Sequence, residues 1–182
     1  MKPLIFIGPI GAGKSTISNM VAEKLSLPSF SLDEEEHLGA SVGYDVDLYN
    51  RMQDEVGPLK AYEYRRGFYD RLVPLFLASH DQGVLDLGGG HPIVPDRSKQ
   101  ETIKKALDPY EHVFLLMPTP DPMESITILR ERNKLASDEP DLNELYFQGG
   151  NRTFWEIAKF PIYTEGKTPV QTCEEILKHL HL

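Results

Sequence analysis

An apolar run that ends in a glycine-rich loop constrains the fold of this chain more than any other feature. Residues 3–7 read PLIFI, and the loop GPIGAGKS follows at residues 8–15. A continuous apolar run is typical of a strand buried on both faces of a parallel sheet. Apolar residues keep helical spacing over residues 14–25, so the loop joins a strand to a helix. The sequence therefore predicts the opening unit of an α/β fold.

The loop has the residue spacing of a nucleotide phosphate-binding site. Gly8 and Gly13 are separated by four residues, and Lys14 and Ser15 follow directly. Glycines let successive backbone N–H groups turn toward an anion, and the N-terminus of the next helix adds a partial positive charge. Lys14 is expected to reach the β- and γ-phosphates, and the Ser15 hydroxyl to bind Mg²⁺. We expect ATP and Mg²⁺ as cofactors, without excluding GTP, and nucleotide contacts from Gly8, Gly11, Ala12, Gly13, Lys14, Ser15 and Thr16.

Strands and helices alternate along the rest of the chain. Apolar runs predict strands at residues 29–32, 112–117 and 160–164, and another that runs from residue 83 into a glycine cluster. Residues 44–79 have helical spacing with a break at Gly57 and Pro58, whereas residues 133–151 are polar and helix-poor. This alternation predicts a three-layer α/β fold with a mostly parallel sheet, whose ligands bind at the carboxyl ends of the strands.

Asp86 ends one of these apolar runs, in GVLDLGG. A carboxylate at the end of a strand near the phosphate loop is a candidate second metal ligand, acting together with Ser15 directly or through water. The alternative is that Asp86 caps the turn into the glycines.

Composition restricts the function classes. A chain of 182 residues with 40% hydrophobic residues is sufficient for one domain over residues 1–182. The formal net charge of −9 argues against nucleic acid or an anionic membrane as partner, so we expect a small-molecule ligand. Cys173 is the one cysteine, and the apolar N-terminal run is too short to span a bilayer. We expect a cytoplasmic protein that is a monomer or a weak homodimer.

Five segments carry a resemblance to a known family: GPIGAGKST, FSLDEE, YRRGFYDRL, the triple glycine at residues 88–90, and NRTFWEIAKFPIYTEGKTP. In this order, over nearly the whole chain, they resemble the shikimate kinases and their close relatives. The resemblance implies a three-layer P-loop kinase fold with a five-stranded parallel sheet in the order 2-3-1-4-5, helices on both faces and a mobile lid. It places acceptor-binding helices at about residues 33–80 and the lid at about residues 133–151, called the lid segment below.

The resemblance also implies roles for single residues. Asp33 would hold an acceptor hydroxyl and take its proton, and Arg65 would grip the acceptor carboxylate as one planar group facing another. Arg130 or Arg132 would stack on adenine or reach over the phosphates. The implied catalytic residues are Lys14, Asp33 and Arg152, and the implied substrate-binding residues are Asp33, Arg65, Gly88, Gly89, Gly90 and Arg152. His91, next to the glycines, either touches the acceptor or begins the following loop.

Three departures from the family pattern bear on the acceptor. Ser31 stands where the family has the first aspartate of Asp-x-Asp, Phe68 replaces a glutamate, and no arginine lies between Arg132 and Arg152. We therefore expect a phosphotransferase that moves the γ-phosphoryl group to a hydroxyl of a small anionic metabolite, with shikimate as the first acceptor to consider. The alternatives are a gluconate-like acid, a nucleoside monophosphate, or a nucleotide-binding regulator without transfer activity.

Overall fold

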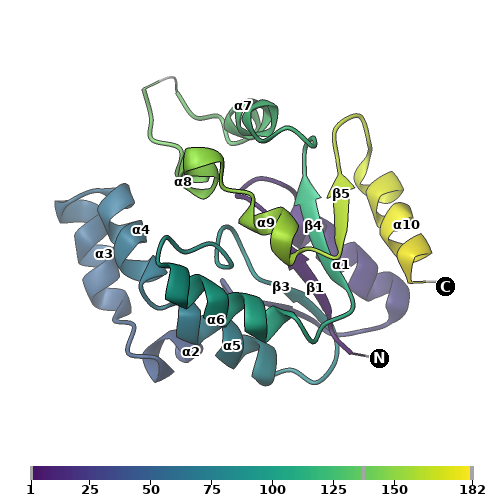
Figure 1. Ribbon diagram of the computed structural model, residues 1–182, viewed down its shortest axis with the longest axis horizontal. Coiled ribbons are helices and arrows are strands. Elements are labelled where there is room, and N and C mark those ends of the chain that lie inside the picture. Colours follow the sequence, from purple (N-terminus) through teal and green to yellow (C-terminus); the bar gives the residue numbers. More distant parts are fainter. Residues whose placement is uncertain (1, 137, 181–182) are drawn as a thin grey trace.

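The computed structural model describes residues 2–136 and 138–180, which fold around a five-stranded parallel sheet (Figure 1). The strands are β1 (Leu4–Ile7), β2 (Ser29–Ser31), β3 (Val84–Asp86), β4 (Val113–Met117) and β5 (Phe160–Tyr163). They lie side by side in the order β2-β3-β1-β4-β5, and every neighbouring pair is parallel. The predicted P-loop kinase fold and its strand order are therefore confirmed.

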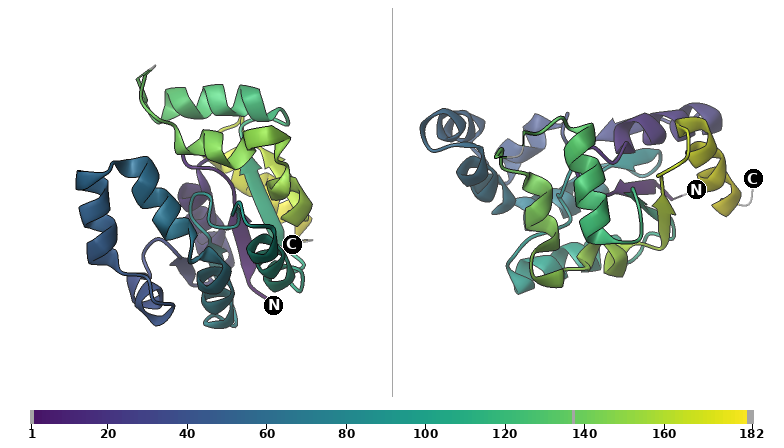
Figure 2. Two further views of the ribbon diagram at one scale, coloured as in Figure 1. Left: turned by 60° about the vertical axis from the view of Figure 1, so that its left-hand side comes forward. Right: turned by 90° about the horizontal axis from the view of Figure 1, so that it is seen from above.

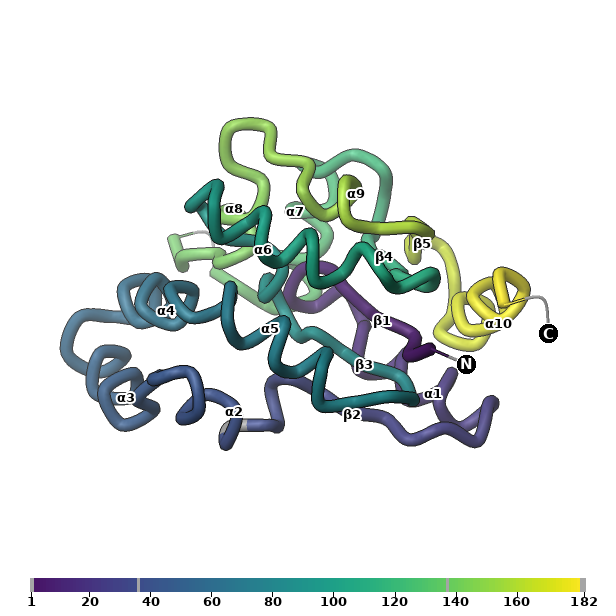
Figure 3. The backbone as a smooth tube through the Cα atoms, turned by 60° about the horizontal axis from the view of Figure 1, so that its bottom comes forward, coloured from purple at the N-terminus to yellow at the C-terminus, as the bar shows by residue number. Residues whose placement is uncertain are grey.

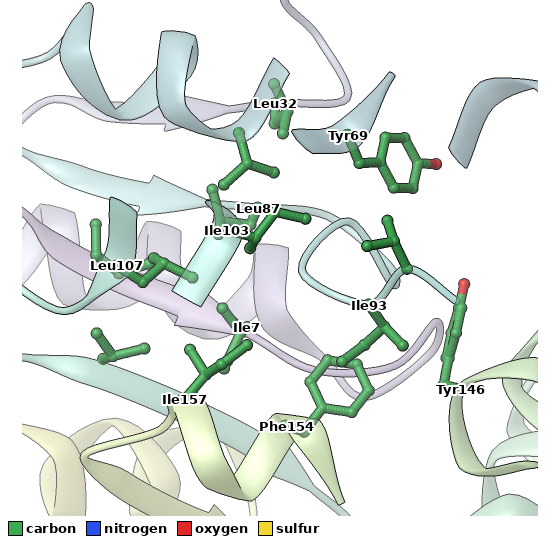
Figure 4. Close-up of a cluster of buried hydrophobic side chains, with 14 of the residues drawn as sticks. Ile7, Leu32, Tyr69, Leu87, Ile93, Ile103, Leu107, Tyr146, Phe154 and Ile157 are labelled. Carbon is green, nitrogen blue, oxygen red and sulfur yellow. The ribbon is translucent and has the colours of Figure 1, made fainter. Parts of the chain in front are cut away.

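Helices cover both faces of the sheet (Figure 2). Helices α1 (Lys14–Leu25) and α10 (Pro169–His179) pack against one face, in a cluster with Leu4, Phe6 and Phe114. Helices α5 (Tyr69–Ala78), α6 (Arg97–Leu107) and α9 (Thr153–Ile157) pack against the other, in a cluster that includes Ile7 and Leu87 (Figure 4). Because β1 and β4 are buried on both faces, their sequences are continuous apolar runs instead of alternating patterns.

The remaining helices lie around the carboxyl ends of the strands or to one side of the sheet. Helices α2 (Glu36–Ser41), α3 (Val46–Glu55) and α4 (Pro58–Arg66) follow β2, and α3 and α4 stand out to one side (Figures 1 and 3). Helices α7 (Pro122–Arg132) and α8 (Leu142–Phe147), followed by the short η1 (Gln148–Gly150), lie beyond the carboxyl end of β4. As predicted, the long helical stretch is broken at Gly57, with Pro58 at the start of α4.

The lid segment corrects one expectation. It is not helix-poor throughout, because α8 forms where the Asp141 side chain accepts a hydrogen bond from the backbone N–H of Asn143 at 2.9 Å. Asn143, Tyr146 and Phe147 are buried, so this part of the lid segment packs into the core. The sequence expectation was wrong here because a helix of 6 residues is too short to show a periodic pattern.

None of the helices within residues 2–136 and 138–180 is both long and apolar enough to cross a membrane.

Candidate active site

The phosphate-binding loop lies at the carboxyl end of β1, as the sequence predicts. Gly13 has a φ of 89°, a left-handed conformation that favours glycine, and it starts α1. A side chain at Gly8 would collide with the backbone carbonyl of Leu116 in β4. The two glycines of the motif are therefore required by backbone geometry and by packing against the sheet.

Lys14 is folded back over this loop. Its side chain is buried, and Nζ donates a hydrogen bond to the Pro9 carbonyl at 2.9 Å. Burial lowers the pKa of the Lys14 ammonium from its usual value, and the negative charges of Asp86 and Asp33 oppose that shift. The cation is thus near both acidic residues that the sequence assigned to the site.

Ser15 and Asp86, the two residues predicted to bind a metal ion, are in contact. The Ser15 hydroxyl donates to Asp86 Oδ2 at 2.8 Å, and the Gly88 N–H donates to Asp86 Oδ1 at 2.8 Å. Asp86 therefore also caps the turn into the glycines, so the two interpretations of this residue are compatible. Among the described residues, no group of three or more His, Cys, Asp or Glu side chains could hold a metal ion. Mg²⁺ bound here would depend on phosphate oxygens and water for its remaining ligands.

Asp33 and Arg65 come together from two distant segments. Asp33 follows β2, and its Oδ1 accepts a hydrogen bond from Arg65 Nη2 of α4 at 3.1 Å. The register of β2 on β3 pairs Ser31 with Asp86, which brings Asp33 to the glycine turn after β3. Asp33 and Arg65 both line a cavity of about 290 Å³, to which α3 also contributes lining residues. Two of the predicted acceptor residues thus border a space that a small molecule could enter, whereas Gly88, Gly89, Gly90 and Arg152 do not line it.

The triple glycine allows three parts of the site to approach closely. A side chain at Gly88 would collide with Asp33, one at Gly89 with Ile10, and one at Gly90 with the Tyr146 ring of α8. The space left by the absent side chains is therefore filled by the protein itself. Contact between these glycines and an acceptor stays a prediction.

The His91 ring lies next to the Asp33 carboxylate. It is buried, and its Nε2 is 3.8 Å from Asp33 Oδ1. Within the described chain, neither ring nitrogen makes a hydrogen bond of normal geometry. Burial lowers the pKa of His91 to about 3, so the ring is neutral near pH 7. His91 therefore adjoins the carboxylate expected to hold the acceptor.

The three candidate arginines lie in different environments. Arg132 lines a cavity of about 200 Å³ together with Gly13, Thr16 and Pro169, next to the start of α1. The Arg130 guanidinium instead donates hydrogen bonds to the carbonyls of Ala136 and Glu139, so it stabilises the backbone conformation of the lid segment.

Arg152 is exposed, and its guanidinium lies over the Trp155 ring at 4.6 Å from the ring centre. Over residues 2–136 and 138–180, neither Arg130 nor Arg152 bonds to residues 8–15 or to Asp33. Of the three arginines, Arg132 is therefore the one that borders the phosphate-binding loop.

Asn143 is a site residue that sequence reasoning missed. The Ile10 N–H donates to Asn143 Oδ1 at 2.8 Å, and Asn143 Nδ2 donates to the Ile10 carbonyl at 3.1 Å. Asn133 Nδ2 reaches the same carbonyl at 3.4 Å. Tyr146 adds a hydrogen bond from its hydroxyl to the Gly89 carbonyl at 3.2 Å. The lid segment therefore touches both the phosphate-binding loop and the glycine turn, although no motif marks these residues.

No family model matches the chain. It is 27% identical over 183 residues to a shikimate kinase of Enterococcus faecalis, a match that covers 99% of each chain. The structure is similar to that of a shikimate kinase from Acinetobacter baumannii in complex with shikimate, with a TM-score of 0.65 and 17% identity over 100% of this chain and 93% of that one. A gluconokinase from Sinorhizobium meliloti 1021 gives a TM-score of 0.56 and 15% identity over 99% of this chain and 91% of that one. The resemblance to shikimate kinase-like enzymes, stated above from the sequence, is thereby confirmed.

Proposed function

We propose that this chain, which is similar to shikimate kinases over its whole length, transfers the γ-phosphoryl group of ATP to a hydroxyl of a small carboxylated acceptor. One observation carries this proposal. The phosphate-binding loop, the Ser15–Asp86 pair and the Asp33–Arg65 pair meet at one edge of the sheet. Shikimate is the first acceptor to test, because the relatives similar over the whole length are shikimate kinases.

The chemistry follows from where the charged groups lie. Arg65 would bind the acceptor carboxylate, which turns the acceptor hydroxyl toward Asp33. The hydroxyl oxygen attacks the γ-phosphorus, the bond to the β,γ-bridging oxygen breaks, and the hydroxyl proton passes to the Asp33 carboxylate. Lys14 would stabilise negative charge on the phosphate oxygens. Mg²⁺, when bound beside Ser15 and Asp86, would neutralise further phosphate charge.

The cation that faces the transferred group needs a separate proposal, since the lid segment has no arginine between residues 132 and 152. Arg132 borders the cavity next to α1, which suits contact with the base or the phosphates. Arg152 would have to leave the Trp155 ring to reach the phosphoryl group, and we assign it that role in a closed state of the lid segment. Arg130 is held by backbone carbonyls, which argues against a role at the nucleotide.

The test is the rate of ADP release from ATP and Mg²⁺ with and without an acceptor. The acceptors are shikimate, gluconate and nucleoside monophosphates, each added in turn. Turnover that depends on a carboxylated acceptor supports the proposal. Tight ATP binding without turnover on any acceptor would instead favour a nucleotide-binding regulator, an alternative supported by the lack of a lid arginine.

A further inference from the structure

The cavity beside Asp33 has an unusually aromatic wall for a site that should bind a hydroxylated acid. Tyr44, Tyr49 and Phe68 line it on the side of α3 and α4. The Tyr44 ring lies 5.9 Å from the Tyr49 ring and 5.7 Å from the Phe68 ring, measured between ring centres. These contacts connect the three rings into one continuous surface facing the cavity.

This aromatic wall is only partly covered by the protein. Helix α3 contributes no buried residue to the core, and Val46, which also lines the cavity, is 40% exposed. Phe68 is half-buried. An apolar surface that lines a concave site next to the reacting groups gains stability when a ligand with an apolar face covers it.

Two of the polar side chains that line the cavity bond to residues outside it. Glu35 Oε1 is 2.8 Å from His80 Nε2, and the Tyr49 hydroxyl accepts a hydrogen bond from Gln53 at 2.8 Å. Asp33 and Arg65 are the pair that the proposed reaction uses, and Tyr44 and Asn50 are the other polar residues of the lining. A polyhydroxylated acid needs a hydrogen-bond partner for every hydroxyl that it buries, whereas an aromatic ring packs against Tyr44, Tyr49 and Phe68 without such partners.

We propose that the preferred acceptor is an aromatic ring that carries a carboxylate and one hydroxymethyl group, with fewer hydroxyls than shikimate or gluconate. The inference rests on the proposed function and specifies its acceptor. The carboxylate binds Arg65, the hydroxyl faces Asp33, and the ring packs against Tyr49 and Phe68. Transfer is the same balanced reaction: a bond forms from the acceptor oxygen to the γ-phosphorus, ADP leaves, and the proton goes to Asp33.

Two measurements on the full chain test this inference separately from the kinase activity. Dissociation constants are measured by calorimetry for meta- and para-hydroxymethylbenzoate, for shikimate and for gluconate, with a non-hydrolysable ATP analogue and Mg²⁺ present. At least one hydroxymethylbenzoate should bind tenfold or more tightly than shikimate and gluconate. Equal or tighter binding of shikimate or gluconate would overturn the inference. ADP release with the same acceptors reports on the proposed function, which can fail or succeed independently of this ranking.

Variants locate the preference in the aromatic wall. Phe68→Gln should weaken binding of the hydroxymethylbenzoate tenfold or more, while binding of shikimate changes less than threefold. Leu59→Gln is the matched control, because Leu59 lies on α4, is 37% exposed and does not line the cavity. Tyr49→Gln provides a second test of the same wall if Phe68→Gln does not fold. If Phe68→Gln or Tyr49→Gln folds and the ratio of the dissociation constants for the hydroxymethylbenzoate and shikimate is unchanged, the inference is contradicted.

Discussion

The side-chain amide of Asn143 pairs with both backbone groups of Ile10, accepting from its N–H at 2.8 Å and donating to its carbonyl at 3.1 Å. Asn143 is fully buried in α8, and Ile10 lies within the phosphate-binding loop. A primary amide can satisfy a backbone N–H and a carbonyl at once, which few side chains can do. The lid segment therefore helps to fix the shape of the loop that is expected to hold the nucleotide.

Asn143→Ala should damage both stability and nucleotide binding. Loss of the amide leaves the Ile10 N–H without its partner and removes one of the two donors to the Ile10 carbonyl, at a cost of about 1–3 kcal/mol in the free energy of unfolding. The KM for ATP should rise several-fold because the loop loses its fixed shape. Asn19→Ala is the control, since Asn19 bonds to Ser29 in an exposed position. A nucleotide affinity equal to that of the wild type would show that the contact serves stability alone.

The opening unit of the fold was predictable from sequence because two independent patterns coincide there. The apolar run of β1 indicates a strand buried on both faces, and the glycine spacing before Lys14 fixes the loop that follows. Asp86 was identifiable for the same reason, as a carboxylate at the end of an apolar run. These features are local, so a single sequence displays them.

The roles of the lid residues could not be predicted in this way. Asn143 and Tyr146 act through contacts with Ile10 and Gly89, which lie far away in sequence. Nothing in a polar segment distinguishes a buried asparagine from a solvated one. The bonds from Arg130 to the carbonyls of Ala136 and Glu139 were equally unpredictable from the sequence, and a nucleotide contact of Arg130 stays a prediction.

Asp86→Asn should increase the requirement for Mg²⁺. The amide keeps the size of the side chain, but it removes the negative charge beside Ser15 that would attract the ion. We expect the Mg²⁺ concentration for half-maximal ADP release to rise about tenfold, equivalent to about 1.4 kcal/mol. A titration of activity with Mg²⁺, after removal of metal with EDTA, measures the change. An unaltered Mg²⁺ dependence would remove Asp86 from the metal site.

Arg65→Ala should act mainly on the acceptor. The substitution removes the guanidinium that faces Asp33 in the cavity, so the acceptor KM should rise about tenfold to a hundredfold, whereas the KM for ATP should change little. Arg71→Ala is the control. The Arg71 guanidinium lies over the Phe68 ring, so it is another arginine near the cavity, but it does not line the cavity. The split between the two KM values is read from steady-state kinetics. An unchanged acceptor KM would contradict the placement of the carboxylate.

His91→Gln should alter how stability depends on pH. The pKa of His91 is about 3 in the folded protein and about 6.5 when unfolded, so the unfolded chain binds a proton that the native state does not. This contribution to stability is complete above pH 6.5 and is lost progressively as the pH falls toward 3. The glutamine of the variant takes up no proton, so the unfolding free energy of the variant should fall less steeply than that of the wild type between pH 6 and pH 4. The two slopes should differ by up to about 1.4 kcal/mol per pH unit. Urea titrations at several pH values measure the two slopes, and equal slopes would show that His91 is solvated.

The γ-phosphoryl group is expected to go to an acceptor hydroxyl and not to water. Phosphorus NMR on a mixture of ATP, Mg²⁺ and the tightest-binding carboxylated acceptor measures this directly, with Lys14→Met run beside the wild type. Lys14 is positioned over the loop, so the variant should retain its fold and lose turnover. A phosphate ester of the acceptor should form in step with ADP in the wild type and should be absent with Lys14→Met. Release of inorganic phosphate alone, or an ester formed equally fast by Lys14→Met, would contradict it.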